Sequence, residues 1–188
     1  VELHIRHMPG GKFTDVVFST LKEKDILRIE GPYGSFYLRE DSDKPMVLLA
    51  SGTGFAPIKA LLEHMQHKNI QRPARLYWGG RRPSDLYMND WVVSKLALMP
   101  NLQYIPVVSD ALPEDNWTEK KDMNDNTGDG FVGFIHNCVI DNYLNHHESP
   151  EDIELYFCGP PLMNKAVQKM GEDFGMPDEN IRFDDFGG

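Results

Sequence analysis

A continuous apolar run followed by a glycine-rich turn constrains the fold of this chain more than any other feature. Residues 46–50 are uniformly apolar, residues 51–57 (SGTGFAP) form the turn, and residues 58–65 have apolar side chains at helical spacing. Such a run is typical of a strand covered on both faces, as in a parallel sheet. Gly52 and Gly54 let a ligand approach the backbone, and the N–H groups that open the next helix attract anions. This stretch alone is either a pyrophosphate site or an ordinary strand-to-helix turn.

The alternation of strand and helix continues to the end of the chain. The apolar patterns predict strands at residues 46–50, 74–80, 102–108, 153–158 and 180–183, and helices at residues 57–67, 83–98, 131–144 and 161–174. This order predicts an α/β fold, a doubly wound parallel five-stranded sheet with helices on both faces. The polar segment 111–130 is long for a connection, and we expect a mobile insertion there, chiefly at residues 119–130.

The first 43 residues have a different pattern. Alternation predicts strands at residues 1–6 and 25–30 and a short one at 36–38, and residues 12–21 predict a helix. This is the texture of a small antiparallel barrel, with too few strands to close it. The polar segment 40–45 predicts a boundary between domains at 1–43 and 44–188. Because the chain begins at Val1 in an apparent strand, without methionine, we expect it to be a piece of a longer protein.

Composition excludes several classes of function. A chain of 188 residues can form one good core, or one domain and part of another. Its formal net charge of -10 argues against nucleic-acid binding, which needs a basic surface. Cys138 and Cys158 have no metal-type spacing, so we expect neither a disulfide framework nor a metal site, and a reducing compartment is favoured.

Three strand ends carry candidate chemistry. Ligands of open parallel sheets bind outside the carboxyl ends of the strands. Here these ends carry Ser51-Gly52-Thr53-Gly54, Gly79-Gly80-Arg81-Arg82 and Cys158-Gly159-Pro160-Pro161. We expect them to converge on one crevice. Arg81 and Arg82 either meet phosphate or an adenine face, or are solvated charges. Cys158 either faces a nicotinamide ring or ends a core strand.

The segments SGTGFAP and CGPP resemble the two signature segments of the ferredoxin–NADP reductase-like flavoprotein family. Residues 31–36 (GPYGSF) are similar to that family's link between flavin barrel and nucleotide domain, and residues 11–14 (GKFT) to the helix start that holds the flavin pyrophosphate. The resemblance implies a sheet of order 3-2-1-4-5 preceded by an incomplete antiparallel FAD-binding barrel.

The two halves of the chain resemble different members of that family. Residues 112–117, 133–136, 156–164 and 184–188 are similar to F subunits of Na+-translocating NADH:quinone reductases. Residues 11–14, 33–39 and 78–82 look more like reductase components of bacterial oxygenases or of deoxysugar biosynthesis. The chain is therefore either a divergent F subunit or a hybrid joined in the middle.

The resemblance implies hydride transfer from NADH to FAD and onward passage of single electrons to an iron–sulfur and quinone pathway. It places Ser51 near the flavin edge, Cys158 beside the nicotinamide and Phe186 over the isoalloxazine ring as the catalytic residues. The implied flavin contacts are Gly11, Lys12, Phe13 and Thr14. The implied dinucleotide contacts are Gly52, Thr53, Gly54, Phe55, Ala56, Pro57, Gly80, Arg81, Asp110, Gly159, Pro160, Pro161 and Met163.

The choice between NADH and NADPH has a physical basis. A 2′-phosphate needs arginine-type partners, and NADPH-using relatives often carry a Ser-Arg pair after the third strand. Here the pair is Ser109-Asp110. An aspartate repels phosphate and can bond a ribose hydroxyl, so NADH is favoured, with Arg81 and Arg82 as counter-arguments.

Some parts of the family pattern are missing. The Arg-x-Tyr-Ser flavin motif lies upstream of Val1 in the family, so we expect this chain to bind FAD weakly or not at all. A [2Fe–2S] domain and a membrane anchor are expected only on absent segments, through which the chain would join membrane subunits at the cytoplasmic side of the bacterial inner membrane. The alternatives are a soluble oxygenase or deoxysugar reductase component, and a truncated or hybrid module without turnover.

Overall fold

The computed structural model describes residues 1–185, and backbone contacts divide the chain into two units, Val1–Ser35 and Phe36–Gly188. Each unit is described by itself. The predicted domain boundary between residues 43 and 44 falls in the polar segment that leads into the sheet of the second unit, and it stays a prediction.

The first unit contains one helix, α1 (Lys12–Ser19), between extended and turn segments. The prediction of a helix at 12–21 is confirmed, although the helix ends earlier, at Ser19, with Thr20 as its C-cap. The predicted strands at 1–6 and 25–30 are wrong, as is the short one at 36–38 in the second unit. A strand needs a hydrogen-bonded neighbour, and these segments have no ladder partner among the described residues. The described residues therefore form no antiparallel barrel.

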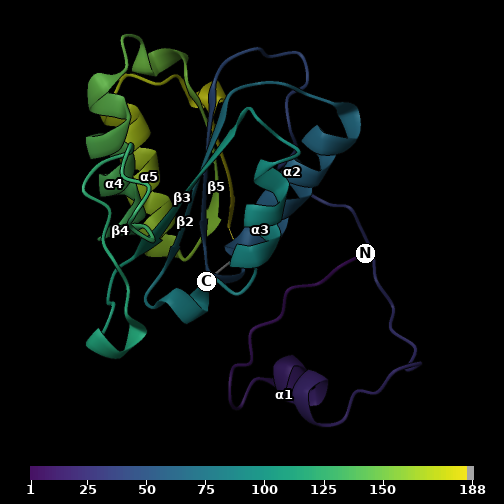
Figure 1. Cartoon of the computed structure of the whole chain (residues 1–188). Coiled ribbons are helices and arrows are strands. Elements are labelled where there is room, and N and C mark those ends of the chain that lie inside the picture. Colours follow the sequence, from purple (N-terminus) through teal and green to yellow (C-terminus); the bar gives the residue numbers. More distant parts are fainter. Residues whose placement is uncertain (186–188) are drawn as a thin grey trace. The chain divides into compact units, whose positions relative to one another are not determined.

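The second unit is built on a parallel sheet of six strands in the order β4-β3-β2-β1-β5-β6 (Figure 1). The strands are β1 (Met46–Ser51), β2 (Ala74–Gly80), β3 (Leu102–Val108), β4 (Phe131–Val132), β5 (Glu154–Gly159) and β6 (Ile181–Asp185). The predicted α/β class is confirmed and the five predicted strands are present in the predicted relative order, but the prediction of a five-stranded sheet is wrong because a sixth strand extends it. The helix predicted over 131–144 is wrong at its start, because Phe131 and Val132 pair with Val107 and Val108 as a sixth, edge strand. Aromatic and β-branched side chains suit a strand better than a helix start.

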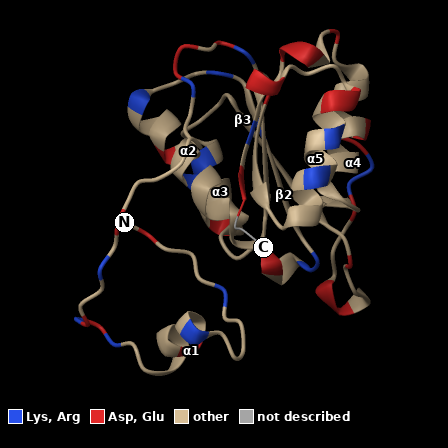
Figure 2. Cartoon of the chain, turned by 180° about the vertical axis from the view of Figure 1, so that it is seen from behind, with Lys and Arg blue, Asp and Glu red and all other residues tan. Residues whose placement is uncertain are grey.

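Four α-helices cover the two faces of the sheet, as Figure 1 and the reverse view in Figure 2 show. Helices α2 (Phe55–Lys68) and α3 (Asn89–Leu96) lie on one face, and α4 (Ile135–Asn142) and α5 (Pro161–Asp173) lie on the other. The short 3-10 helices are η1 (Gly52–Gly54), η2 (Pro83–Asp85), η3 (Pro113–Asp115), η4 (Leu144–His146), η5 (Pro150–Asp152) and η6 (Asp178–Asn180).

The helix predicted over 83–98 is interrupted. Its first turn is η2, and α3 begins only at Asn89. The Asp85 carboxylate accepts hydrogen bonds from the backbone N–H groups of Arg81 and Arg82 at 2.8 and 3.0 Å. These bonds close a separate turn after β2. Asp side chains often bond nearby backbone N–H groups in this way, and such bonds compete with helix formation.

An apolar layer lies on each side of the sheet, which explains the uniform apolar run of β1. Leu48 and Ala50 face the layer under α2 and α3, while Val47 and Leu49 face the layer under α4 and α5. Figure 2 shows the charged residues mainly on loops and helix surfaces. None of the helices in the described part of the chain is long and apolar enough to cross a bilayer.

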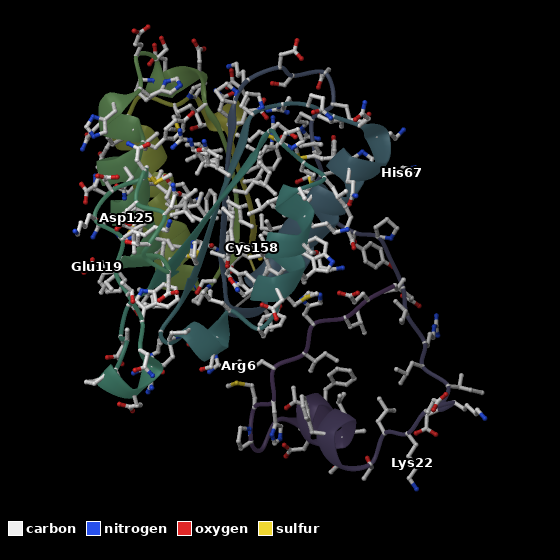
Figure 3. All side chains as sticks on the ribbon, in the orientation of Figure 1. Arg6, Lys22, His67, Glu119, Asp125 and Cys158 are labelled. Carbon is white, nitrogen blue, oxygen red and sulfur yellow. The ribbon has the colours of Figure 1, made fainter. Side chains whose placement is uncertain are left out.

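The long segment after β3 closes on itself. Glu119 and Gly130 form a bridge, with the Lys120 N–H donating to the Gly130 carbonyl at 2.8 Å. Asp125 accepts hydrogen bonds from Thr127 and from the Lys121 N–H, and these bonds hold its pKa well below the ordinary value. Figure 3 shows Glu119 and Asp125 on the side of the sheet that carries α4. The mobility predicted for this segment stays a prediction.

Candidate functional site

A cavity of about 600 Å³ lies in the second unit at the carboxyl ends of the five strands β1 to β5. This size lies within the usual range for small-molecule sites, roughly 300–1,000 Å³. Its lining residues are Ser51, Gly79, Gly80, Arg81, Ser109, Gly133, Phe134, Ile135, His136, Pro160, Leu162, Met163 and Ala166. The three strand ends that carry candidate chemistry therefore meet in one crevice, and that prediction is confirmed.

The glycine-rich turn after β1 and the CGPP segment after β5 are in direct contact. A Cβ added at Gly54 would lie 2.1 Å from the Cys158 carbonyl oxygen, and one at Gly159 would lie 2.6 Å from Met163 Sδ. Gly54 needs glycine because it packs directly on the backbone of Cys158, whereas a side chain at Gly159 would meet the flexible end of Met163 and, at 3.2 Å, the Ser51 Cβ. Gly52 has a φ of 56°, in the left-handed region that favours glycine. Gly52, Gly54 and Gly159 thus set the course of the backbone in the turns that follow β1 and β5.

Five of the predicted site residues line the cavity: Ser51, Gly80, Arg81, Pro160 and Met163. Phe55 has its ring in the core, stacked on Trp78 with ring centroids 3.9 Å apart. The other predicted dinucleotide contacts lie close to the cavity in sequence but are not among its lining residues; they are Gly52, Thr53, Gly54, Ala56, Pro57, Asp110, Gly159 and Pro161.

Cys158 does not line the cavity and is fully buried in β5 (Figure 3). Burial, with the nearby carboxylates of Asp184 and Asp185, raises the pKa of its thiol to about 12. At neutral pH this side chain is therefore an uncharged, buried thiol. The predicted role of Cys158 beside the nicotinamide stays a prediction.

The predicted flavin contacts lie in the first unit. Gly11 is the N-cap of α1 and gives that helix no side-chain cap. The Thr14 hydroxyl donates to the Met8 carbonyl at 2.9 Å and accepts from the Met8 N–H at 3.2 Å. Lys12 and Phe13 are the first two residues of α1. Phe186 lies outside the described residues.

Sequence reasoning missed one wall of the cavity. Phe134, Ile135 and His136 follow the unexpected strand β4 and reach the cavity together. The rings of Phe134 and His136 are stacked, with centroids 6.0 Å apart. Partial burial lowers the pKa of His136, so its imidazole is neutral at pH 7. The similarity of residues 133–136 to F subunits marks this stretch in the sequence but does not place it at the cavity.

The helix starts favour an anion in this cavity. Ile135 begins α4 and lines the cavity, Leu162 and Met163 line it from the first turn of α5, and Ser51 immediately precedes η1. The N-terminal end of a helix carries a partial positive charge and free N–H groups. These ends can attract a phosphate group even in a chain of net negative charge.

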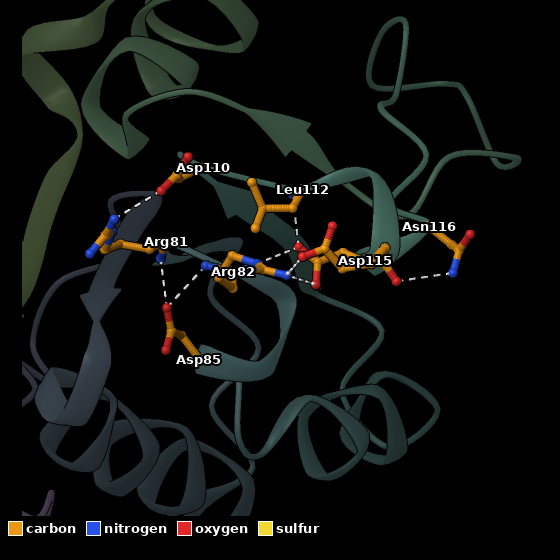
Figure 4. Close-up of polar contacts among 8 residues, drawn as sticks. Arg81, Arg82, Asp85, Asp110, Leu112, Asp115 and Asn116 are labelled. Atoms are coloured by element: carbon orange, nitrogen blue, oxygen red, sulfur yellow. Dashed lines mark hydrogen bonds and ion pairs between the residues drawn. The ribbon is translucent and has the colours of Figure 1, made fainter.

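Charged residues after β2 and β3 form a cluster beside the cavity, which we name the loop cluster: Arg81, Arg82, Asp85, Asp110, Glu114 and Asp115 (Figure 4). Arg81 donates to Asp110 at 2.9 Å. Arg82 donates to both carboxylate oxygens of Asp115 at 2.5 and 2.7 Å and to Glu114 at 3.4 Å. The bonds from Arg82 and from the Leu112 N–H hold the pKa of Asp115 below its usual value.

The doubly wound sheet, the glycine-rich turn and the cavity at the strand ends define a dinucleotide-binding α/β domain. Comparison with known proteins gives the same class. The model for the oxidoreductase NAD-binding domain matches residues 48–169, and the model for the oxidoreductase FAD-binding domain matches residues 1–37. The chain belongs to the oxidoreductase NAD-binding domain family.

Named relatives lie in the reductase group. The chain is 39% identical over 181 residues to the F subunit of the Na+-translocating NADH-quinone reductase of Neisseria meningitidis, covering 96% of this chain and 42% of the relative. It is 40% identical to the corresponding protein of Haemophilus influenzae, with 96% and 41% covered. The cytochrome P450 reductase GcoB of Amycolatopsis superposes with a TM-score of 0.76 at 29% identity, covering 97% of this chain and 50% of that one.

These matches confirm the resemblance to ferredoxin–NADP reductase-like flavoproteins and extend over both halves of the chain. The chain spans about two fifths of the length of the curated relatives it matches.

The described residues fit FAD only in part. The start of α1 has no side-chain cap, so its N–H groups suit a pyrophosphate. The Thr14 hydroxyl is bound to Met8, and no barrel strand is formed in the described residues to receive the isoalloxazine ring. The fit is therefore to the pyrophosphate half alone.

Proposed function

We propose that this chain is the NADH-binding part of an FAD-dependent oxidoreductase, in which the cavity holds NADH while its hydride passes to the flavin. The observation that carries the proposal is the contact between the SGTG turn and the CGPP segment at the cavity. Each segment alone is a weak signal, whereas their close packing at the ends of β1 and β5 creates one continuous binding surface.

The chain's own residues would bind and orient the dinucleotide. The open backbone at Gly52 and the helix starts around the cavity would take the pyrophosphate. Ser51, Pro160 and Met163 would border the nicotinamide, since they line the cavity where β1 and β5 end. When bound, FAD supplies hydride acceptance and release of single electrons. Phe186 remains a proposed cover for the flavin.

The loop cluster supports NADH over NADPH. The Arg81 guanidinium is paired with Asp110, and the Arg82 guanidinium with Asp115 and Glu114. A 2′-phosphate would have to displace these carboxylates and would be repelled by them. A ribose with two free hydroxyls carries no such charge.

The relatives suggest the physiological setting. By analogy with the F subunit of Na+-translocating NADH-quinone reductase, we propose onward electron transfer through an iron–sulfur domain to a quinone pathway, at the cytoplasmic side of a bacterial inner membrane. The alternative is a reductase component that serves an oxygenase, which the similarity to the Amycolatopsis cytochrome P450 reductase favours.

Calorimetric titration of the chain with NADH tests the proposal. We expect a dissociation constant on the order of micromolar, which corresponds to about 8 kcal/mol of binding free energy. Gly159→Val should weaken binding because its side chain would displace Met163 and press on Ser51, which both line the cavity, while Val93→Ala on the exposed face of α3 should leave binding unchanged. A folded wild-type chain that gives no heat with NADH would refute the proposal.

Turnover separates this proposal from a folded module without activity. NADH oxidation by ferricyanide should depend on added FAD, because the fit to FAD is incomplete. If the chain binds NADH and excess FAD produces no oxidation, the chain is a binding module.

A further inference from the structure

Arg82 and Asp115 form an ion pair next to the cavity but outside its lining. The pair is bidentate, with Arg82 Nε and Nη2 donating to the two oxygens of Asp115. Its side chains are 30% and 15% exposed, whereas those of the neighbouring pair of Arg81 and Asp110 are 79% and 52% exposed. A bidentate, half-shielded pair fixes orientation as well as distance.

Both ends of this pair are anchored in the backbone. The Arg82 N–H donates to Asp85, and the Leu112 N–H donates to Asp115 at 2.9 Å (Figure 4). The pair therefore joins the loop after β2 to the loop after β3. The same two loops share backbone hydrogen bonds, from the Ser109 N–H to the Gly80 carbonyl at 3.0 Å and from the Asp110 N–H to the Arg81 carbonyl at 2.8 Å.

The joined loops form one wall of the cavity. Gly80, Arg81 and Ser109 line it, and Arg82 follows Arg81 directly. The loop after β2 is tightly packed at Gly80, where an added Cβ would lie 2.6 Å from the Asp85 Cβ, and the loop after β3 is hydrogen-bonded to its backbone. Any shift of the loop after β3 must therefore move this wall.

We propose that Asp115 is a positioning residue for nucleotide binding: by holding Arg82, it keeps the loop after β3 against the loop after β2 and makes this wall select NADH over NADPH. The inference rests on the proposed function, because it assumes that the cavity holds the dinucleotide. Asp115 is not among the residues that line the cavity, so it acts through Arg82, Gly80 and Ser109.

The charges of the loop cluster determine which of the two nucleotides, NADH or NADPH, is favoured. The two guanidinium groups are paired with three carboxylates, those of Asp110, Glu114 and Asp115, and both guanidinium groups are engaged. Asp115→Asn removes one negative charge and releases Arg82. The less ordered cavity wall weakens the binding of both nucleotides, but the released Arg82 guanidinium can pair with the 2′-phosphate of NADPH. The ratio of the two dissociation constants therefore reports more than loss of structure.

The chain offers a matched control and a conservative replacement. Glu114 also pairs with Arg82, but through one 3.4 Å contact and with its side chain 67% exposed. Glu114→Gln removes the same charge without breaking the bidentate pair. Asp115→Glu keeps the carboxylate and should retain most of the wild-type affinity that Asp115→Asn loses.

The test is calorimetric titration of the full chain with NADH and, separately, NADPH. Asp115→Asn should raise the dissociation constant for NADH by about tenfold, the scale of one lost charge-assisted hydrogen bond. The constant for NADPH should rise less, so that their ratio falls severalfold. Glu114→Gln should change the NADH constant by less than about twofold, as for an exposed ion pair. Hydrogen exchange at the Ser109 and Asp110 amides should be faster in Asp115→Asn.

Each other outcome counts against a stated claim. Equal losses for NADH and NADPH, unchanged binding, unchanged amide exchange, or an equal effect of Glu114→Gln would overturn the role of Asp115 while leaving the proposed function intact. A wild-type chain that binds neither nucleotide would overturn the proposed function and this inference with it.

Discussion

At the scale of single residues, the site depends on glycines that allow two segments to touch. Gly54 lies against the backbone of Cys158, where even a methyl group has no space. Gly52 has open space but a left-handed φ of 56°. The two glycines of the same turn are thus required for different physical reasons, one for packing and one for conformation.

Alanine substitutions should separate these reasons. Gly54→Ala should lower the free energy of unfolding by about 3 kcal/mol, because the backbone facing it must move. Gly52→Ala should cost about 1 kcal/mol, the penalty of a left-handed residue with a Cβ. Urea unfolding followed by tryptophan fluorescence measures both, and equal effects would contradict the account.

The buried thiols should be chemically inert in the native protein. Burial raises the pKa of Cys138 to about 11 and that of Cys158 to about 12, so both are protonated below pH 9. Iodoacetamide should label neither residue between pH 7 and 9, and the labelling rate should not rise with pH until the chain unfolds. Both should be labelled in denaturant. Rapid labelling of native Cys158 would show an accessible thiolate and would contradict its described burial.

The sequence was informative at the residue scale where chemistry lies at a strand end. Ser51, Gly80, Arg81 and Pro160 lie at or just beyond the ends of predicted strands, so topology alone brings them together. Phe134 and His136 could not be placed, because they reach the cavity only through the two-residue strand β4. Pairing of that strand depends on β3, a partner distant in sequence, and no local pattern encodes it.

At the scale of elements, a buried ion pair fastens the chain entering β1 to the sheet. Arg72 donates to Glu154 at 2.9 Å and to the carbonyl groups of Arg39 and Lys44 at 2.9 and 2.8 Å. Both charged side chains of the ion pair are 4% exposed. The Tyr156 hydroxyl also donates to Glu154, at 2.8 Å. This network lies at the end of the sheet where β1 and β5 begin.

Breaking one half of this pair should be costly. Glu154→Gln leaves Arg72 buried without a counter-charge and should lower the free energy of unfolding by about 3–5 kcal/mol. The double variant Arg72→Met with Glu154→Leu should cost much less, because it leaves no buried charge. Urea unfolding of Arg72→Met, of Glu154→Leu and of the double variant gives the coupling energy between the two side chains. Additive costs would contradict the pairing.

The same pair predicts a dependence of stability on pH. Burial alone would raise the pKa of Glu154, but hydrogen bonds with Ser42, Arg72 and Tyr156 outweigh it and lower the pKa below 4.5. The folded state therefore binds this proton less tightly than the unfolded chain, and the contribution is fully present above pH 4.5. It should be lost as the pH falls below that value, and Glu154→Gln should flatten this part of the profile.

Strand prediction succeeded where burial made the pattern unambiguous. The strands β1, β2 and β3 match their apolar runs because both faces of the sheet are covered. The segments 1–6 and 25–30 also alternate, yet they form no strand among the described residues. Alternation indicates a strand that could pair, whereas pairing needs a neighbour that the local sequence does not specify.

At the scale of the whole molecule, the chain consists of a second unit built on the six-stranded parallel sheet and a first unit that contains one helix. The family model for FAD binding matches residues 1–37, but the described structure forms no barrel there. We therefore expect weak binding of FAD by the 188-residue chain. Gel filtration in excess FAD, followed by an absorbance spectrum near 450 nm, measures retention, and a stoichiometric yellow complex would contradict this expectation.

The central claim is that NADH occupies the cavity where β1 to β5 end. Amide chemical-shift mapping during titration with NADH tests it most directly. If NADH binds there, we expect saturable shifts at Ser51–Phe55, Gly80–Arg81, Ser109, Phe134–His136 and Leu162–Met163 in the wild-type chain, and the same shifts only at higher NADH concentration in Gly159→Val. Saturable shifts confined to other surfaces would contradict this claim. So would the absence of shifts in a folded sample at millimolar NADH, a concentration that detects binding as weak as about 4 kcal/mol.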